Sequence, residues 1–336
     1  MHGWIILDKP LGLGSTQGVS AVKRVLRQGG YGKGIKVGHG GTLDPLATGV
    51  LPIAVGEATK LAGRMLDSDK VYDFTIRFGV KTSTLDAEGE VVAESNVRPT
   101  REALEAVLPR FTGPIDQVPP AYSALKIDGE RAYDLARAGE EVVLASRRVT
   151  IHSLISSPER GGGPFASAHG GGGGPLGESL AEAPLHPQPA AGGPPPRAGE
   201  ELQDITLTAH VSKGTYIRSL ARDIALALGT VGHVTMLRRI KAGPFTLAPA
   251  ISLDKLNEMG QARTLEQILL PLRAGLDDIP ALALDPDQAG ALRQGRVLAG
   301  IAVDDGQYFA MLGDTPVALV EALDAQVRVV RGFNLD

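Results

Sequence analysis

The stretch VGHGGTLDPLATGVL, residues 37–51, joins a glycine-rich segment to an apolar one and decides how the chain is expected to fold. It contains one carboxylate, Asp44, immediately before a proline. Glycines permit unusual φ values or close contact with a partner. Those before the carboxylate are Gly38, Gly40 and Gly41. Residues 49–56 are apolar and bounded by glycines, which predicts a short buried strand. Asp44 is therefore expected where a loop enters the core, a position that fixes a side chain well.

Each part of this stretch has an ordinary structural interpretation. An Asp-Pro dipeptide is most often a helix N-cap followed by proline at the first helical position. A single histidine such as His39 is most often a hydrogen-bonded loop residue. The whole string is more specific. Gly-His-x-Gly-Thr-Leu-Asp-Pro-x-Ala-x-Gly-x-Leu, residues 38–51, resembles the catalytic signature of the TruB-type tRNA pseudouridine-55 synthases.

Composition limits the classes of protein that fit. The 336 residues allow one large domain with a small one, or two domains. The absence of cysteine excludes disulfides and thiolate metal sites and fits a cytoplasmic protein. The seven histidines show no paired ligand spacing, so no metal site is expected. Apolar runs are too short for a membrane span or a signal peptide, so we expect a soluble protein without membrane partners.

Charge is unevenly distributed along the chain, although the net charge is only −4. Residues 1–70 carry nine Lys and Arg against five Asp and Glu, and residues 204–249 carry six against two. Residues 250–336 carry seven against thirteen and are acidic. Phosphate contacts need a local basic face rather than a basic total, so the two basic segments favour a nucleic-acid substrate. Two ordinary solvated surfaces would give the same counts.

The N-terminal segment raises a rival hypothesis. A strand at 4–7, a glycine turn and a helix to about Arg27, capped by Ser15 or Thr16, are the context of a dinucleotide-binding fingerprint. The third glycine position holds Gln17, and no acidic residue ends a second strand at the expected distance. An oxidoreductase is therefore disfavoured.

Periodicity and turn residues predict the remaining elements. Helices are expected at 57–66, 100–108, 132–137 and from a Thr215 cap, with largely helical structure at 253–272. Strands are expected at 70–79, from 90, at 142–155 and at 205–211, followed by a small β domain after 285. Asp128-Gly129 predicts a hairpin turn. Residues 157–203 are rich in glycine and proline, which predicts a disordered insertion between two strands of one sheet.

Other segments resemble the same family. They are Lys9-Pro10-x-Gly12, the tyrosine after Asp-x-Asp-Lys at 67–70, residues 118–126, Lys-Gly-Thr-Tyr-Ile-Arg at 213–218 and residues 232–240. The resemblance implies a nucleophilic Asp44, a Tyr72 that stacks on the target base and an Arg218 that pairs with the aspartate. The spacing of Arg218 and Arg222 alone favours a solvated basic face. The resemblance also implies substrate-binding positions at His39, Tyr216, Leu237 and Lys9.

The implied reaction breaks the N1–C1′ bond of uridine and rejoins the base through C5. It changes no oxidation state and loses no atom, so no cofactor or metal is expected. A carboxylate can hold an intermediate at C6 of the base or at C1′ of the ribose, and both remain open. The charge of Asp44 in a partly dry pocket calls for a guanidinium partner. A base inside folded RNA must be flipped out and stacked on a side chain.

These observations lead to one expected architecture. The resemblance implies an α/β (α+β) pseudouridine synthase fold, with a mixed, mostly antiparallel central sheet flanked by helices. We expect a catalytic domain at 1–250, a helical connector at 251–280 and a small PUA-like β domain at 281–336. The expected substrate is uridine 55 in the T arm of tRNA, bound by a monomer. Alternatives are an RNA-binding or RNA-folding protein on the same scaffold, and a synthase for another RNA.

Overall fold

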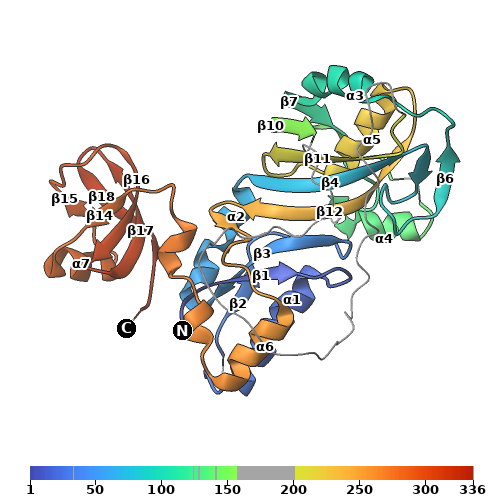
Figure 1. Ribbon diagram of the computed structural model, residues 1–336. Helices are drawn as coiled ribbons and strands as arrows, with labels where there is room; N and C mark the ends of the chain where they lie inside the picture. The colour runs from blue at the N-terminus through green and yellow to red at the C-terminus, as the bar shows by residue number, and fades with distance from the viewer. Residues whose placement is uncertain (33, 124, 128, 141, 157–200, 336) are drawn as a thin grey trace, which may run out of the picture.

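The computed structural model describes residues 1–335, apart from 33, 124, 128, 141 and 157–200 (Figure 1). Two main sheets organise these residues, one of nine strands and one of five. The five-stranded sheet is formed by the C-terminal part of the chain and lies beside the larger body (Figure 1). No helix in the described part of the chain is long and apolar enough to cross a membrane.

The nine-stranded sheet has the order β1-β3-β12-β4-β11-β10-β7, with β2 paired to β3 and β13 paired to β12. Its strands are β1 Gly3–Lys9, β2 Val37–His39, β3 Ala47–Val55, β4 Lys70–Phe78, β7 Gly113–Gln117, β10 Arg147–Ser156, β11 Asp204–Val211, β12 Gly232–Ala242 and β13 Phe245–Thr246. Only the β3–β12 pair is parallel among these strands. The expected mixed, mostly antiparallel sheet is confirmed.

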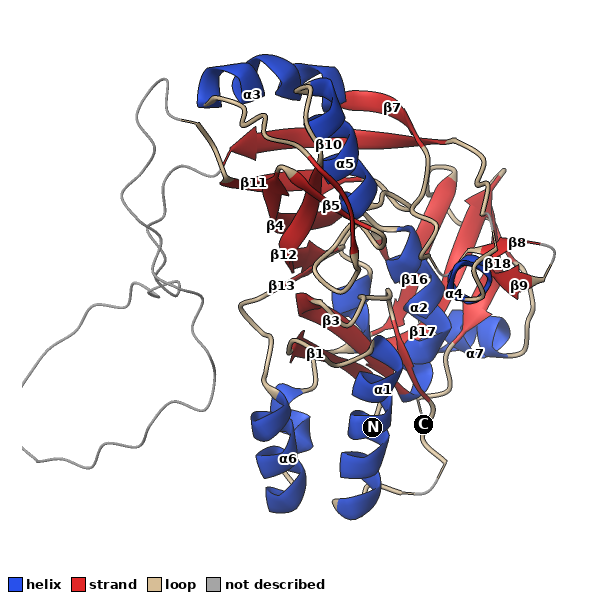
Figure 2. Cartoon of the chain, turned by 90° about the vertical axis from the view of Figure 1, so that its right-hand side faces the viewer, coloured by secondary structure: helices blue, strands red, loops and turns tan. Residues whose placement is uncertain are grey.

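Helices lie around this sheet, and two small hairpins extend from it. The helices are α1 Ser15–Gln28, α2 Ala62–Asp67, α3 Arg101–Val107, α4 Ala132–Arg137, α5 Ile217–Ala227, α6 Leu253–Ala262 and α7 Pro286–Arg293, with 3₁₀ turns at Gly56–Leu61, Leu108–Phe111, Leu265–Ile268 and Leu272–Gly275. The hairpins pair β5 Val80–Thr82 with β6 Val91–Glu94, and β8 Lys126–Ile127 with β9 Glu130–Arg131. α1 and α6 lie side by side at one end of the body (Figures 1 and 2).

The two faces of the nine-stranded sheet differ because side chains alternate along a strand. On β4, Phe74, Ile76 and Phe78 are buried in one hydrophobic cluster with residues of α5. Intervening positions carry polar side chains: Thr75 hydrogen-bonds Thr206, and Arg77 pairs with Asp204. One face is therefore covered by α5, whereas the other remains polar and partly exposed.

Several expected boundaries were wrong for identifiable reasons. Neither Ser15 nor Thr215 caps its helix; the N-cap residues are Gly14 and Tyr216. The Ser15 hydroxyl binds backbone atoms of Leu43 instead, and the Thr215 hydroxyl donates to a preceding carbonyl. Residues 142–146 are not part of β10. The helix expected at 57–66 is divided into a 3₁₀ turn and α2. The largely helical structure expected at 253–272 is confirmed by α6 and the 3₁₀ turn Leu265–Ile268.

The glycine-rich insertion lies outside the described residues, apart from 201–203. Its flanks are placed, and β10 and β11 pair as antiparallel neighbours. The prediction that the insertion separates two strands of one sheet is confirmed. Asp128, the first residue of the expected hairpin turn, also lies outside the described residues.

The C-terminal sheet confirms the expected small β domain. Its order is β14-β16-β17-β18-β15. The strands are β14 Ala281–Ala283, β15 Leu298–Ala299, β16 Gly306–Leu312, β17 Thr315–Leu323 and β18 Gln326–Gly332. One of its faces packs with α7 around a separate core. Phe309 and Phe333 instead join a cluster that contains Trp4 of β1, so the small sheet also packs against the larger body.

Candidate active site

A cavity of about 460 Å³ opens beside the loop that carries Asp44. This volume suits a ligand the size of a nucleoside. Five of the predicted site residues line it: Asp44, Tyr72, Tyr216, Arg218 and Leu237. They come from the loop before β3, from β4, from α5 and its N-cap, and from β12. His39 and Lys9 do not line the cavity.

The loop that carries Asp44 is held by backbone hydrogen bonds on both sides of the carboxylate. On one side, the Leu43 N–H donates to the Ser15 hydroxyl at 2.7 Å, and that hydroxyl donates to the Leu43 carbonyl at 3.0 Å. On the other side, the Pro45 carbonyl accepts from Gly12 N at 2.9 Å. Such bonds fix the loop before any ligand arrives, as a precisely placed reactive group requires.

Arg239 also holds the loop that carries Asp44. Its guanidinium is buried and donates to the carbonyls of Gly41, Thr42 and Val50. At Gly49 the backbone has a φ of +98°, and an added Cβ would lie 2.2 Å from the Arg239 carbonyl. Glycine is therefore required where β3 meets β12.

The glycines before Asp44 were expected to allow close contact with a neighbouring group, and this expectation is confirmed only in part. A Cβ on Gly40 would lie 2.6 Å from Met65 Cβ, whereas one on Gly38 would meet nothing within 4 Å.

Arg218 connects two carboxylates. Its Nη2 donates to Asp44 Oδ2 at 2.7 Å, and its Nη1 lies 3.2 Å from Asp86 Oδ2. The same two nitrogens donate to the carbonyls of Tyr122 and Thr84 at 3.0 and 2.9 Å. The Arg218 side chain is 8% exposed and that of Asp44 is 46% exposed. The solvated-face interpretation is therefore wrong for Arg218, which holds a carboxylate that faces the cavity.

Tyr72 and Leu237 form a less polar part of the lining. Tyr72 is partly buried and packs against the cluster formed by the covered face of β4 and α5. Leu237 lies opposite Ala47 of β3 and Phe74 of β4 in the sheet register. An aromatic ring and an aliphatic side chain beside a carboxylate can hold a flat, partly apolar group.

Tyr216 is fixed at the N-cap of α5. Its N–H donates to Gln117 Oε1 at 2.8 Å, and its carbonyl accepts from Gln117 Nε2 at 3.1 Å. The Arg147 guanidinium lies 4.6 Å from the Tyr216 ring centroid. Arg147 lines the cavity, and its Nε and Nη2 have no partner among the described residues. These buried N–H groups therefore lack the acceptor that buried donors normally have.

Lys9 does not have the direct substrate contact that was expected. The residue is fully buried, and its ammonium donates to the carbonyls of Pro10, Leu13 and Pro45 at 3.0, 2.6 and 3.2 Å. Burial lowers the pKa of Lys9 to about 8, although the charge of Asp44 acts in the opposite direction. Lys9 thus helps to position the loop that carries Asp44, because its ammonium donates hydrogen bonds to backbone carbonyls, including that of Pro45.

His39 lies at the end of β2, which pairs with β3. Its ring is half-buried, and its Nδ1 has no hydrogen-bond partner among the described residues. Burial, followed by the charge of Arg239, lowers the pKa of His39 below its ordinary value of 6.5. The ring is therefore kept in its neutral form near pH 7, at a position outside the cavity lining.

Sequence reasoning missed three groups that complete the site: Asp86, Arg239 and Gln117. Asp86 and Gln117 stand in stretches where no motif was recognised, and Arg239 lies in a matched segment without an assigned role. Asp86 lies in a polar stretch, Asp-Ala-Glu-Gly at 86–89, yet it is 5% exposed. The burial of Asp86 could not be predicted from the local sequence, because it arises when this segment folds back onto β12, where Asp86 forms a β-bridge with Val234.

Comparisons with known proteins agree with this geometry. Residues 23–158 match the family model described as TruB family pseudouridylate synthase (N terminal domain). Residues 218–277 match the model described as tRNA pseudouridylate synthase B C-terminal domain.

Two relatives named tRNA pseudouridine synthase B match over nearly the whole chain. The one from Novosphingobium aromaticivorans is 62% identical over 100% of this chain and 98% of its own length. The one from Zymomonas mobilis is 54% identical over 99% of this chain and 96% of its own length.

The fold also has a solved counterpart. A chain in the structure of an H/ACA RNP bound to a substrate RNA containing 2'-deoxyuridine superposes with a TM-score of 0.66 at 21% identity, covering 99% of this chain and 85% of that one. At this identity the likeness concerns the fold alone. With the motif residues assembled around one cavity and full-length relatives above half identity, this chain belongs to the TruB family of pseudouridylate synthases.

Proposed function

We propose that the chain isomerises uridine 55 in the T arm of tRNA to pseudouridine, with Asp44 as the nucleophile. The observation that carries the proposal is the 2.7 Å pair between Asp44 and Arg218 at the edge of a cavity that Tyr72 and Leu237 also line. The names of the relatives support tRNA as the class of substrate.

The chemistry follows from the groups that face the cavity. The buried guanidinium of Arg218 lies against the Asp44 carboxylate and hydrogen-bonds it. The carboxylate attacks either C6 of the base or C1′ of the ribose, the N1–C1′ bond breaks, and the base turns. A bond then forms between C1′ and C5, and the bond to Asp44 breaks, which releases the carboxylate. The proton on C5 is lost and N1 is protonated. Atoms and electrons balance without a further reactant.

Recognition of the flipped uridine is assigned to the rest of the lining. Tyr72 stacks on the base, Leu237 contacts its apolar edge, and Tyr216 packs beneath the carboxylate. The unpartnered N–H groups of Arg147 suit a phosphate of the same nucleotide. His39 lies outside the cavity lining. It occupies the space that the flipped bases vacate, or it contacts the phosphates of those nucleotides. The basic segments at 1–70 and 204–249 hold the RNA backbone, so binding is salt-sensitive.

The remaining expectations belong to the same proposal. The catalytic domain spans residues 1–250, the helical connector 251–280 and a PUA-like domain 281–336. The chain acts as a monomer in the cytoplasm. The C-terminal domain at 281–336 is acidic, with four Lys and Arg against eight Asp and Glu, so we assign most phosphate contacts to the catalytic domain.

The test uses a tRNA transcript with tritium at uridine C5. Wild-type protein should release tritium as the C1′–C5 bond forms, and Asp44→Asn should release none above background. Asp277→Asn, an exposed carboxylate outside the cavity lining, is the matched control and should retain wild-type release. Chemical mapping should place the product at uridine 55.

The possible outcomes separate the alternatives. Release by neither wild type nor control, with tRNA still bound, would favour an RNA-binding protein on the same scaffold. Release with a product elsewhere would identify a synthase for another position or another RNA. Release by Asp44→Asn would remove this residue from the centre of the reaction.

A further inference from the structure

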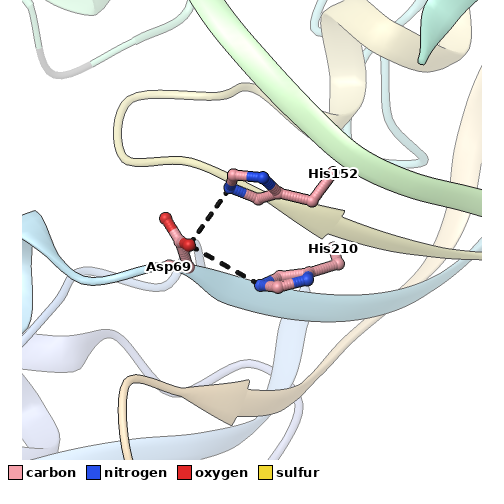
Figure 3. Close-up of side chains that lie close together, drawn as sticks. All are labelled: Asp69, His152 and His210. Atoms are coloured by element: carbon pink, nitrogen blue, oxygen red, sulfur yellow. Dashed lines mark ion pairs between the residues drawn. The ribbon is translucent and has the colours of Figure 1, made fainter. Parts of the chain in front are cut away.

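A second cluster of chemically active side chains lies apart from the cavity lining (Figure 3). It consists of Asp69 on the turn before β4, His152 on β10 and His210 on β11. His210 precedes Val211, which lines the cavity, and successive side chains on a strand point to opposite faces. The cluster therefore lies on the polar face of the sheet, behind one wall of the cavity.

The three side chains converge on one point. Asp69 Oδ2 lies 3.1 Å from His152 Nε2 and 3.7 Å from His210 Nε2. One ligand atom from each residue lies within 4.8 Å of the others. The two imidazole rings have centroids 4.6 Å apart and are tilted by 45°. Figure 3 shows both rings directing a nitrogen toward the same carboxylate oxygen.

A local irregularity of β10 produces this arrangement. In the pairing of β10 with β11, Ile151 lies opposite Val211 and Ser153 lies opposite His210, so His152 is the additional residue of a β-bulge. A bulge redirects the side chain of its additional residue. Here it brings His152 over His210 instead of leaving the two rings at separate positions along the strands.

The ligand atoms have the spacing that a metal ion requires. Zinc binds histidine nitrogen and carboxylate oxygen at about 2.0–2.2 Å, so ligand atoms in a tetrahedral site lie roughly 3.4 Å apart. The Asp69 oxygen lies 3.1 and 3.7 Å from the two histidine nitrogens, which is close to this value. Two imidazoles and one carboxylate form a set that divalent transition metals prefer over magnesium or calcium.

We propose that Asp69, His152 and His210 form a binding site for one divalent transition-metal ion, such as Zn²⁺, with water in the remaining coordination position. The side chains are 37% to 47% exposed, so an ion can enter from solvent. The neutral form of imidazole is the form that coordinates a metal ion. The charge of Lys241 acts on His210 and opposes a cation. We therefore expect binding weaker than that of closed structural zinc sites.

An ion at this position would connect three segments that build the cavity wall. Asp69 lies just before β4, on which Tyr72 lies, and Val211 directly follows His210 on β11. Both residues line the cavity from the other side of the sheet. The ion would therefore brace the strand that carries the proposed stacking tyrosine, without itself entering the reaction. This binding proposal does not depend on the proposed function.

The test uses full-length protein without an affinity tag, freed of metal by a chelator. Isothermal titration with Zn²⁺ should show one ion bound per chain with a dissociation constant below about 10 µM, corresponding to roughly 7 kcal/mol of binding free energy. His152→Ala/His210→Ala should lose this binding, and Asp69→Asn should weaken it at least about tenfold. Zn²⁺ should raise the unfolding temperature of wild type but not of the double variant.

A matched control removes two other histidines. His169→Ala/His186→Ala, in the part of the chain outside the described residues, should bind Zn²⁺ as wild type does. Circular dichroism should show that each variant remains folded. Equal binding by wild type and His152→Ala/His210→Ala would overturn the proposal, as would loss of binding in the control alone. Absence of a one-to-one event in wild type would show that the cluster is only a surface ion pair.

Discussion

Two acid–cation clusters lie on opposite faces of the nine-stranded sheet and differ in burial. Arg218 joins Asp44 to Asp86, and the Arg218 and Asp86 side chains are 8% and 7% exposed. Asp69 joins His152 to His210, and all three side chains are more than a third exposed. The buried guanidinium has carboxylate and carbonyl partners at both terminal nitrogens.

The difference in burial gives the clusters different capacities. Charges that are withdrawn from water need complete partners, and a charge left unpaired there is costly. The Arg218 cluster therefore holds the Asp44 carboxylate in one position. Exposed groups can exchange water for another ligand at little cost, so the Asp69 cluster is free to bind an ion.

The largest effect is expected from Arg218→Met, which keeps the length of the side chain and removes its charge. Asp86 would remain buried without its cation, so the free energy of unfolding should fall by about 3–5 kcal/mol. Tritium release should fall by about 10²–10³-fold, because Asp44 loses the partner that holds it. Urea unfolding and the tritium assay measure the two effects.

Arg222→Met is the matched control, one turn along α5. Arg222 pairs with its neighbour Asp223 and is 20% exposed, so the loss of stability should be below about 1 kcal/mol. Equal losses in the two variants would show that burial does not distinguish the arginines.

Lys70 sharpens the comparison because it directly follows Asp69 and is buried. Its ammonium donates to the carbonyls of Met65, Leu66 and Ser68. Burial lowers the pKa of Lys70 from 10.5 to about 8. Below pH 8 the lysine is protonated in both the folded and unfolded states, and the folded protein carries the full cost of the buried charge. Between pH 8 and 10.5 only the folded state loses the proton, so stability should rise with pH in this window.

The measurement compares wild type with Lys70→Met by urea unfolding at pH 7.5 and pH 10. The free energy of unfolding of wild type relative to the variant should increase by up to about 3 kcal/mol over this range. Lys9 has a similarly lowered pKa, but it is present in both proteins and cancels in the difference. Parallel pH curves for the two proteins would contradict a buried, charge-destabilised Lys70.

The smallest effect is expected from Asp69→Asn in the presence of a metal chelator. The side chain is 47% exposed, so removal of its charge should change the free energy of unfolding by less than about 1 kcal/mol. Thermal unfolding of wild type and variant under the same conditions measures this difference. A loss as large as that of Arg218→Met would show that the exposed cluster is a structural ion pair of the buried kind.

Local sequence was sufficient for most of the secondary structure. Alternation predicted β4 and β11 because one face of each strand is buried and the other is polar. Helix boundaries were predicted less well. Ser15 has the chemistry of an N-cap, but its hydroxyl is used by Leu43 across the molecule, a competition that no local pattern shows.

The site residues also fall into those that the sequence predicted and those that only the tertiary structure revealed. The motif around Asp44 named the carboxylate, and resemblance named Arg218, which lies 2.7 Å from it. Lys9 was assigned to substrate because Lys9-Pro10-x-Gly12 resembles a family motif, whereas its side chain is buried among backbone carbonyls. Asp86 was overlooked because only folding brings its turn against Arg218.

The sequence by itself determined the family, the alternating strands and the candidate carboxylate Asp44, because each depends on residues that are near neighbours in the chain. Tertiary structure alone decided which charges are buried and which groups meet. Asp86 reaches Arg218, and His152 reaches His210 across a β-bulge, through contacts between distant segments. The spacing of residues along the chain does not predict such contacts, because they depend on strand pairing and register, which are established only when the sheet forms.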